Sequence, residues 1–337
     1  MNYEEFIEYI KEHFLGEYVS YSLYVNSNMT DEERSKLIEN IGEGEVLVRK
    51  IKKNNGIILD AVSIYLNGSK ISPNIYLRPY YEMYVMGKPM DVIISEIIRE
   101  YEVNKNVSLE CTFDCKDYNS IKDKIFIKLI NYELNKDMLK DVVYKKYLDL
   151  AITYRIAFEE TEKGFSSVVI DKSMFNNWRV LEEELYETAI KNTMKMYPYC
   201  IEHLTSMLYG MYEKKMDIIP DDIKEEIELI SHSPDALQIY ILSNTVHIFG
   251  AACILYKNVL RNFTEENDCN VYILPSSLHE CMLVLDEGDV DPVFLKDLLV
   301  DANKSSVGLI DLLSDNVYYY DREKDEISLY DITIPIM

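Results

Sequence analysis

Residues 275–280, with the sequence PSSLHE, gather several side chains that could do chemistry within five positions of a 337-residue chain. Ser276 or Ser277 could act as a nucleophile, His279 as the general base that takes its proton, and Glu280 as the group that orients the imidazole. That arrangement would support hydrolysis through a covalent intermediate. The apolar runs on both sides, NVYIL and CMLVL, predict two strands that carry this segment between them.

The strand geometry disfavours a catalytic role for these residues. Successive side chains of a strand point to opposite faces, so Ser277 and His279 could share a face while Glu280 would point away from His279. The sequence also lacks a G-x-S-x-G nucleophile motif. We therefore interpret the segment as a tight turn in which Pro275 ends one strand. A ligand site on this turn, and catalysis, stay open as alternatives.

The sequence contains only incomplete motifs for metal or cofactor binding, and we predict neither a metal nor a cofactor. HECML begins like a zincin motif, but Leu283 stands where the second histidine would be. Cys111 and Cys115 form a single C-x-x-x-C pair without a second pair downstream, which is not a zinc-ribbon spacing. GEGE at 42–45 is the nearest approach to a phosphate loop, and its carboxylates oppose phosphate. The other histidines are far apart in the sequence: His13, His203, His232 and His247.

The charge balance restricts the classes of partner. The chain has 35 Lys and Arg against 59 Asp and Glu, so its formal net charge is −24. Such a field repels nucleic-acid phosphates and anionic lipid headgroups, and it attracts basic proteins. We therefore expect no direct nucleic-acid binding and a basic protein as the candidate partner. An ordinary acidic surface without a specific partner is the alternative. The sequence does not indicate the oligomeric state.

Membrane and export signals are not found in the sequence. No apolar run approaches the roughly 20 residues that a membrane-spanning helix needs, so we expect no membrane association. The N-terminal MNYEEFIEYIKEHF is acidic and amphipathic, unlike a signal peptide. The six cysteines show no disulfide framework. We expect a cytoplasmic protein.

Two surfaces are candidates for contact with a partner. LDEGDVD contains Asp286, Glu287 and Asp289 without a compensating base, and we expect a solvent-facing loop there. Asp291 would cap the following helix. In VYYYD, strand alternation places Tyr318 and Tyr320 on one face, and an exposed pair there would form a contact surface.

The elements that position these residues indicate an α+β fold with mixed, mostly antiparallel sheets and flanking helices. Hairpins and helices occur without regular βαβ alternation, and Asn55-Gly56 is a strong hairpin signal. We predict that residues 236–286 form a strand pair, a helix and a second strand pair in one sheet. We also predict a short acidic helix after Pro220. The predicted regions are 1–125 and 126–337, and the lack of a clear linker leaves a single domain open.

Several blocks of the sequence resemble domain-of-unknown-function family 5688. SPNIYLRPYYEMYVMGKPMDVIISEIIREY, SMFNNWRVLEEELYETAIKNT, GAACILY, YILPSSLHE and DNVYYYDRE carry the resemblance in this order. It implies an uncharacterised bacterial protein from Firmicutes, often carried on mobile elements, and it implies no catalytic residue. The second half is distantly similar to the uncharacterised YtpQ-related family.

Two functions remain. The first is a non-enzymatic cytoplasmic accessory protein that acts by protein–protein contact, with a basic nucleic-acid-binding protein as the candidate partner. The second is a hydrolase or small-ligand-binding protein whose site is the PSSLHE turn, with Ser276, Ser277, His279 and Glu280. The sequence favours the first.

Overall fold

The computed structural model describes residues 1–66, 72–105, 115–161, 164–215, 220–221, 223–224, 227–228 and 237–331. Most of the segment that we predicted as a loop with an acidic helix after Pro220 lies outside these residues. The chain divides into two compact units. The first contains Met1–Lys53 and Ile57–Glu110, and the second contains Asn54–Gly56 and Cys111–Met337. The short helix α5 (Tyr118–Ile121) thus belongs to the second unit, although it precedes the predicted boundary at 125.

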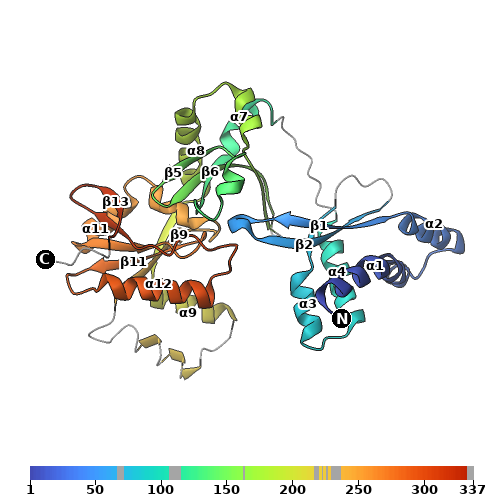
Figure 1. Ribbon diagram of the computed structural model, residues 1–337. Helices are drawn as coiled ribbons and strands as arrows, with labels where there is room; N and C mark the ends of the chain where they lie inside the picture. The colour runs from blue at the N-terminus through green and yellow to red at the C-terminus, as the bar shows by residue number, and fades with distance from the viewer. Residues whose placement is uncertain are drawn as a thin grey trace. The chain divides into compact units, whose positions relative to one another are not determined.

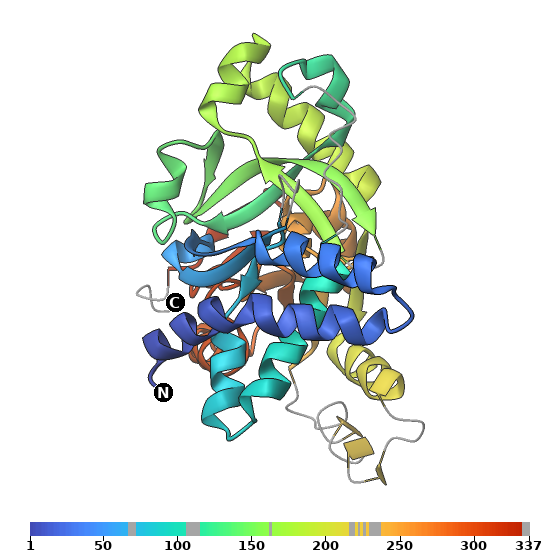
Figure 2. The same ribbon diagram turned by 90° about the vertical axis from the view of Figure 1, so that its right-hand side faces the viewer.

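The first unit packs helices on a small antiparallel sheet (Figure 1). Phe6, Ile10 and Phe14 recur every four residues of its first helix and are buried, which accounts for the amphipathic character of the N-terminal sequence. Figure 2 shows this helix, in dark blue, beside the strands of the unit. Its elements are α1 (Tyr3–Val25), α2 (Asp31–Gly42), β1 (Glu45–Lys52), β2 (Ile58–Tyr65), β3 (Ile75–Tyr76), α3 (Arg78–Val85) and α4 (Met90–Asn104).

The β1–β2 hairpin confirms the turn that Asn55-Gly56 predicted. Both residues have positive φ, 57° and 69°, a conformation that asparagine and glycine tolerate better than other residues. The two strands pair antiparallel from Glu45 opposite Tyr65 to Lys52 opposite Ile58.

The second unit begins with a four-stranded sheet in which β6 pairs with β4, β5 and β7. Helix α8 packs against β4, and its buried Leu185 and Ala189 join the same core as Ile127. The elements of this part are η2 (Lys122–Lys124), β4 (Ile125–Asn131), α6 (Lys136–Leu139), β5 (Tyr144–Tyr147), β6 (Leu150–Thr161), β7 (Gly164–Val169), α7 (Lys172–Trp178) and α8 (Glu182–Met196).

The rest of the second unit is built on a six-stranded sheet with the order β13-β12-β10-β11-β9-β8. Leu295 and Leu299 of helix α12 pack with Tyr272 and Leu274 on one face of this sheet. The elements are β8 (Tyr199–His203), α9 (Leu204–Lys215), β9 (Ile239–Asn244), η3 (Gly250–Leu255), α11 (Val259–Asn267), β10 (Asn270–Leu274), β11 (Cys281–Asp286), α12 (Pro292–Ser306), β12 (Tyr318–Asp321) and β13 (Glu326–Leu329).

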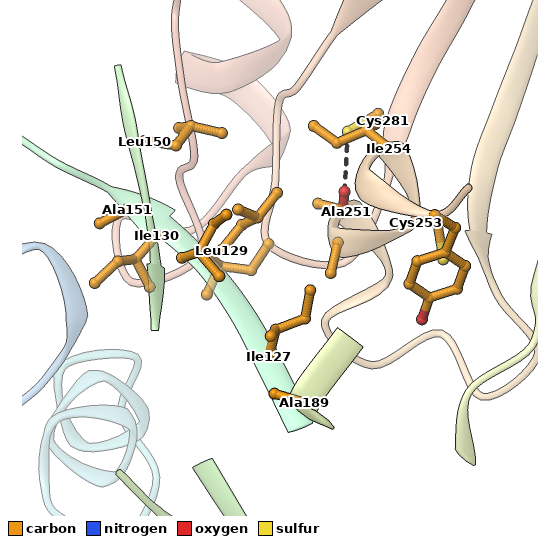
Figure 3. Close-up of a cluster of buried hydrophobic side chains, with 14 of the residues drawn as sticks. Ile127, Leu129, Ile130, Leu150, Ala151, Ala189, Ala251, Cys253, Ile254 and Cys281 are labelled. Atoms are coloured by element: carbon orange, nitrogen blue, oxygen red, sulfur yellow. Dashed lines mark hydrogen bonds between the residues drawn. The ribbon is translucent and has the colours of Figure 1, made fainter. Parts of the chain in front are cut away.

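The opposite face of the six-stranded sheet contributes to the main core of the second unit. Figure 3 shows part of this core, in which Ile127 and Leu129 of β4 lie on one side of Ala251 of η3 and Cys253 lies on the other. The Cys281 thiol points to the Ala251 carbonyl oxygen at 4.0 Å. Among the described helices, none combines the length and the apolar character needed to cross a membrane.

The α+β class is confirmed, and every strand pair between described residues is antiparallel. The first strand pair predicted within residues 236–286 is wrong in its second strand, because residues Gly250–Leu255 form the 3₁₀ helix η3. A Cβ atom on Gly250 would lie 2.3 Å from Ser243 Oγ and 2.4 Å from the His279 carbonyl oxygen. This close approach turns the chain inward against β9, and β9 instead pairs with β8 and β11.

Candidate functional site

The PSSLHE turn joins β10 to β11, as the sequence predicted, and a second segment of the chain holds its backbone. The Leu278 N–H donates to the Asp311 carbonyl at 2.8 Å, and the Leu313 N–H donates to the Ser276 carbonyl at 3.1 Å. Ser277 forms an isolated bridge with Leu312. The turn is therefore fixed on its outer side by residues 311–314.

The side chains of the turn do not form a catalytic triad. Ser276 and Ser277 are only 5% and 8% exposed, and Ser277 Oγ accepts a hydrogen bond from the His279 backbone N–H at 3.1 Å. His279 Nδ1 accepts from the Phe249 N–H at 3.4 Å, and Nε2 lies 3.5 Å from Asp311 Oδ1. A triad needs one ring nitrogen to accept the serine proton. Both nitrogens of this imidazole already face other groups.

The carboxylate beside His279 belongs to Asp311, whereas the sequence had assigned that role to Glu280. No local pattern could have found Asp311, because it lies 32 positions further along the chain. The ring of Phe249 stacks on His279 at 5.9 Å, and Ser243 Oγ donates to the His279 carbonyl at 2.7 Å. These contacts hold the turn against β9 and against the loop before η3. We therefore interpret the turn as structural.

Of the predicted contact residues, the two tyrosines are buried. Tyr318 is 0% exposed and Tyr320 is 3% exposed, so the prediction of an exposed pair is wrong. Strand alternation does place them on one face, but that face meets the main core of the second unit. The Tyr318 hydroxyl donates to Asp149, and burial raises the pKa of Tyr318 far above its usual value.

The predicted acidic loop after β11 lies at the surface in part. Glu287 and Asp289 are exposed. Asp286 is half-buried and accepts hydrogen bonds from the Tyr319 hydroxyl at 2.6 Å and the Gly288 N–H at 3.2 Å. Asp291 caps α12 by accepting from the Val293 N–H at 2.9 Å, as its place before Pro292 indicated. Only Glu287 and Asp289 therefore remain available as a contact surface.

A hollow of about 620 Å³ lies beside strand β8 and helix α11. Sequence reasoning did not find it. The residues that line it come from β8, α11 and one position of β9, and they are Tyr199, Cys200, Ile201, Glu202, His203, Tyr240, Val259, Asn262, Phe263, Glu266 and Asn267.

Strand β8 contributes all five of its residues, Tyr199–His203, to the wall of this hollow. Because neighbouring side chains of a strand point to opposite faces, five consecutive residues can line one hollow only if it runs along the strand backbone. Strand β9 occupies one side of that backbone. The hollow therefore extends from the face of the sheet that carries Tyr240 and α11 to the other side of β8, which ends the sheet among the described strands.

Helix α11 contributes one face to the hollow. Val259, Asn262, Phe263, Glu266 and Asn267 occur at intervals of three and four residues, which places them on one side of a helix. The buried Phe263 ring meets the Tyr240 ring edge-to-face at 5.1 Å, and this contact anchors the helix to the sheet. Glu266 and Asn267 lie in the last turn, where the carbonyl end of the helix favours positive charge.

The electrostatics of the hollow favour a cation. Glu202 and Glu266 are both exposed, and neither has an ion-pair partner among the residues that the structure describes. No lysine or arginine occurs among the lining residues. Tyr240 and Phe263 supply aromatic surface, which attracts cations through the ring quadrupole.

Neither His203 nor Cys200 is poised for catalysis. His203 Nδ1 lies 2.7 Å from Thr205 Oγ1 and accepts from the Thr205 N–H at 3.3 Å, and Nε2 lies 3.3 Å from Gln238 Oε1, so both ring nitrogens are already engaged. Burial raises the pKa of the Cys200 thiol, and the charge of Glu202 raises it further. The thiolate that a nucleophile requires is therefore disfavoured. Among the described residues, no three His, Cys, Asp or Glu side chains converge to hold a metal ion.

A second hollow, of about 540 Å³, lies around Trp178 and Arg179. Its wall mixes both signs of charge, with Lys122 and Arg179 near Asp117 and Glu184. The Trp178 indole N–H donates to the Cys115 carbonyl at 2.9 Å, and its ring packs beside Tyr118. This mixture selects no single sign of ligand charge, so the hollow beside β8 is the better candidate.

Three comparisons with known proteins give one match. Searches of the curated proteins and of the solved structures found none. One family model matches residues 3–322, which span nearly the whole sequence and both units of the fold. The chain therefore belongs to DUF5688, a family of unknown function.

Proposed function

We propose that this protein is a non-enzymatic binding protein that holds a basic segment of a partner protein in the hollow beside β8 and α11. One observation carries the proposal: two exposed carboxylates, Glu202 and Glu266, share an aromatic-walled hollow that has no basic lining residue. The net charge of −24 would steer a basic partner toward the protein over a longer range. A nucleic-acid-binding protein is our first candidate for the partner, since such proteins carry lysine- and arginine-rich segments.

The physical basis is the environment of the bound cation. Lysine or arginine side chains that enter the hollow would meet Glu202 on one face of the sheet, and Glu266 with the aromatic rings of Tyr240 and Phe263 on the other. Because both carboxylates are exposed, an ion pair with either contributes about 0–1 kcal/mol, and a cation over an exposed aromatic ring adds about 0.5–1 kcal/mol. Each contact is modest, and the hollow offers more than the rest of the acidic surface because one basic segment can make several of them there.

The cellular setting is part of the same proposal. We propose a cytoplasmic accessory role in bacteria, on the basis of the sequence resemblance and of the cysteines. Cys115, Cys200, Cys253, Cys269 and Cys281 are free thiols, and structural disulfides are rare in reducing compartments.

The test uses a fluorescently labelled peptide, acetyl-KTKTKTK-amide, and measures its affinity by anisotropy. The variant Glu202→Gln/Glu266→Gln removes both carboxylates from the hollow. The control variant Glu12→Gln/Glu17→Gln removes two exposed carboxylates from α1 in the first unit. Each change shifts the net charge by the same amount, from −24 to −22. We expect the hollow variant to bind about tenfold more weakly, which corresponds to about 1.4 kcal/mol, and the control to bind like the wild type.

Two outcomes would reject the proposal. Equal losses in both variants would show that the peptide senses only the overall charge. A loss confined to Glu287→Gln/Asp289→Asn would place the contact on the acidic loop that the sequence predicted. A pull-down from the native host at two salt concentrations then identifies the partner, provided that the hollow variant fails to retain what the wild type and the control retain.

A further inference from the structure

We propose that the basic segment binds as an additional β-strand along the outer edge of β8. This inference rests on the proposed function and specifies how the partner is held. An extended segment that joins a sheet edge gains main-chain hydrogen bonds, and its alternate side chains enter pockets that select the sequence. The hollow follows the backbone of β8 over Tyr199–His203, which is the geometry that such a segment requires.

The pairing of β8 with β9 identifies the backbone groups on the outer edge. The Thr245 N–H donates to the Pro198 carbonyl at 2.9 Å, which continues the antiparallel register of Cys200 with Ser243. Hydrogen-bonded and non-hydrogen-bonded positions alternate along an antiparallel pair. The N–H and C=O groups of Tyr199 and Ile201 therefore point away from β9 and toward the hollow.

Another sheet edge in the same unit has its outward backbone groups hydrogen-bonded by side chains. Strand β4 also lies at the end of its sheet. There the side chains of α8 bind the outward backbone groups. The Ile127 N–H donates to Thr193 Oγ1 at 3.0 Å, and Asn192 Nδ2 donates to the Ile125 carbonyl at 2.9 Å. Among the described residues, no side chain makes the equivalent contact with Tyr199 or Ile201.

Charge selects the occupant of this edge. Successive residues of an added strand would alternate between the two faces of the sheet. Those on one face would lie beside Glu202, and those on the other face, where Phe263 meets Tyr240, would approach α11 and Glu266. Basic residues therefore fit both sides. A second copy of this chain would bring Glu202 close to its own counterpart, and the like charges would repel.

Backbone methylation of the peptide tests the strand. Two forms of acetyl-KTKTKTK-amide are compared with the parent: one is N-methylated at the three threonines, and the other at the three lysines that follow the first. In a β-strand, alternate N–H groups point to opposite edges. One methylated form should therefore lose at least tenfold in affinity while the other binds within about twofold of the parent, whichever register the lysines adopt.

The outcomes separate this inference from the proposed function. Equal effects of the two methylations would overturn strand addition, and the proposed function would stand as long as the parent peptide still depends on Glu202 and Glu266. Failure of the parent to bind would overturn the proposed function itself. Hydrogen exchange supplies a second readout: the amides of Tyr199 and Ile201 should exchange more slowly with the parent bound. A wild-type dimer that Ile201→Pro dissociates would assign the edge to a second copy and overturn the proposal.

Discussion

Ser277 and Leu274 lie only three positions apart, yet the structure predicts that they contribute differently to the free energy of unfolding. Ser277 Oγ accepts one hydrogen bond, from the His279 N–H, and Leu274 is fully buried against α12. We expect Ser277→Ala to lower the unfolding free energy by about 1 kcal/mol, because one backbone donor loses its partner. Leu274→Ala should lower it by about 2–5 kcal/mol, because it leaves a cavity.

Urea unfolding followed by the fluorescence of Trp178 measures both changes. Trp178 is the only tryptophan in the sequence, and it reports on the second unit, which contains both sites. The same variant tests the alternative function. If Ser277→Ala abolished an activity of the protein while the unfolding curve stayed close to that of the wild type, the turn would be a reaction site and our structural interpretation would be wrong.

At the scale of elements, Thr193 joins a helix to a strand edge. Its hydroxyl donates to the Ala189 carbonyl at 2.6 Å and accepts from the Ile127 N–H at 3.0 Å, and the side chain is buried. Thr193→Val keeps the shape and removes the acceptor. We expect it to lower the unfolding free energy by about 1–3 kcal/mol, which is the cost of leaving a buried N–H without a partner.

Thr188→Val serves as the matched control on the same helix. Thr188 accepts a hydrogen bond from the Tyr118 hydroxyl at 3.2 Å, but it is only half-buried, so water can replace it. The control should cost at most about 1 kcal/mol. Equal losses for the two variants, measured by urea unfolding, would show that α8 does not protect the edge of β4 through this hydroxyl.

Sequence patterns that depend only on neighbouring residues, such as apolar spacing and turn dipeptides, predicted part of the fold correctly. The four-residue spacing of Phe6, Ile10 and Phe14 gave α1, and Asn55-Gly56 gave the hairpin. Residues Gly250–Leu255 are as apolar as a strand, but their conformation depends on the approach of Gly250 to β9 and His279, which no local pattern encodes. The turn at 275–280 was predicted, whereas the hollow was not, because β8 and α11 are separated by 55 residues from His203 to Val259.

At the scale of the whole molecule, the 28 tyrosines should make the unfolding free energy depend on pH in the alkaline range. Burial, the largest cause, raises the pKa values of Tyr101 and Tyr320 to about 12, and that of Tyr318 higher still. An unfolded tyrosine ionises near pH 10. Above that pH the unfolded chain loses protons that the folded chain keeps, so the stability present below pH 10 is lost as the pH rises toward the folded pKa.

We therefore expect the unfolding free energy to fall between pH 10 and pH 12, by about 1.4 kcal/mol per pH unit for each tyrosine that stays protonated only in the fold. Circular dichroism in urea measures the stability, and absorbance at 295 nm counts the tyrosinates. Tyr101→Phe removes one of these groups from the first unit and should make the fall shallower there. A stability that stays constant up to pH 12 would contradict the prediction.

The alkylation rate of the buried cysteines of the second unit can report how often its core opens. Cys253 and Cys281 are fully buried, and burial raises the pKa of Cys253 to about 12 and that of Cys281 well above its usual value. Alkylating reagents react with thiolates, so neither sulfur can be labelled until the core around it opens. The rate at which iodoacetamide modifies these two residues in native buffer therefore measures how often the six-stranded sheet separates from η3, without any denaturant.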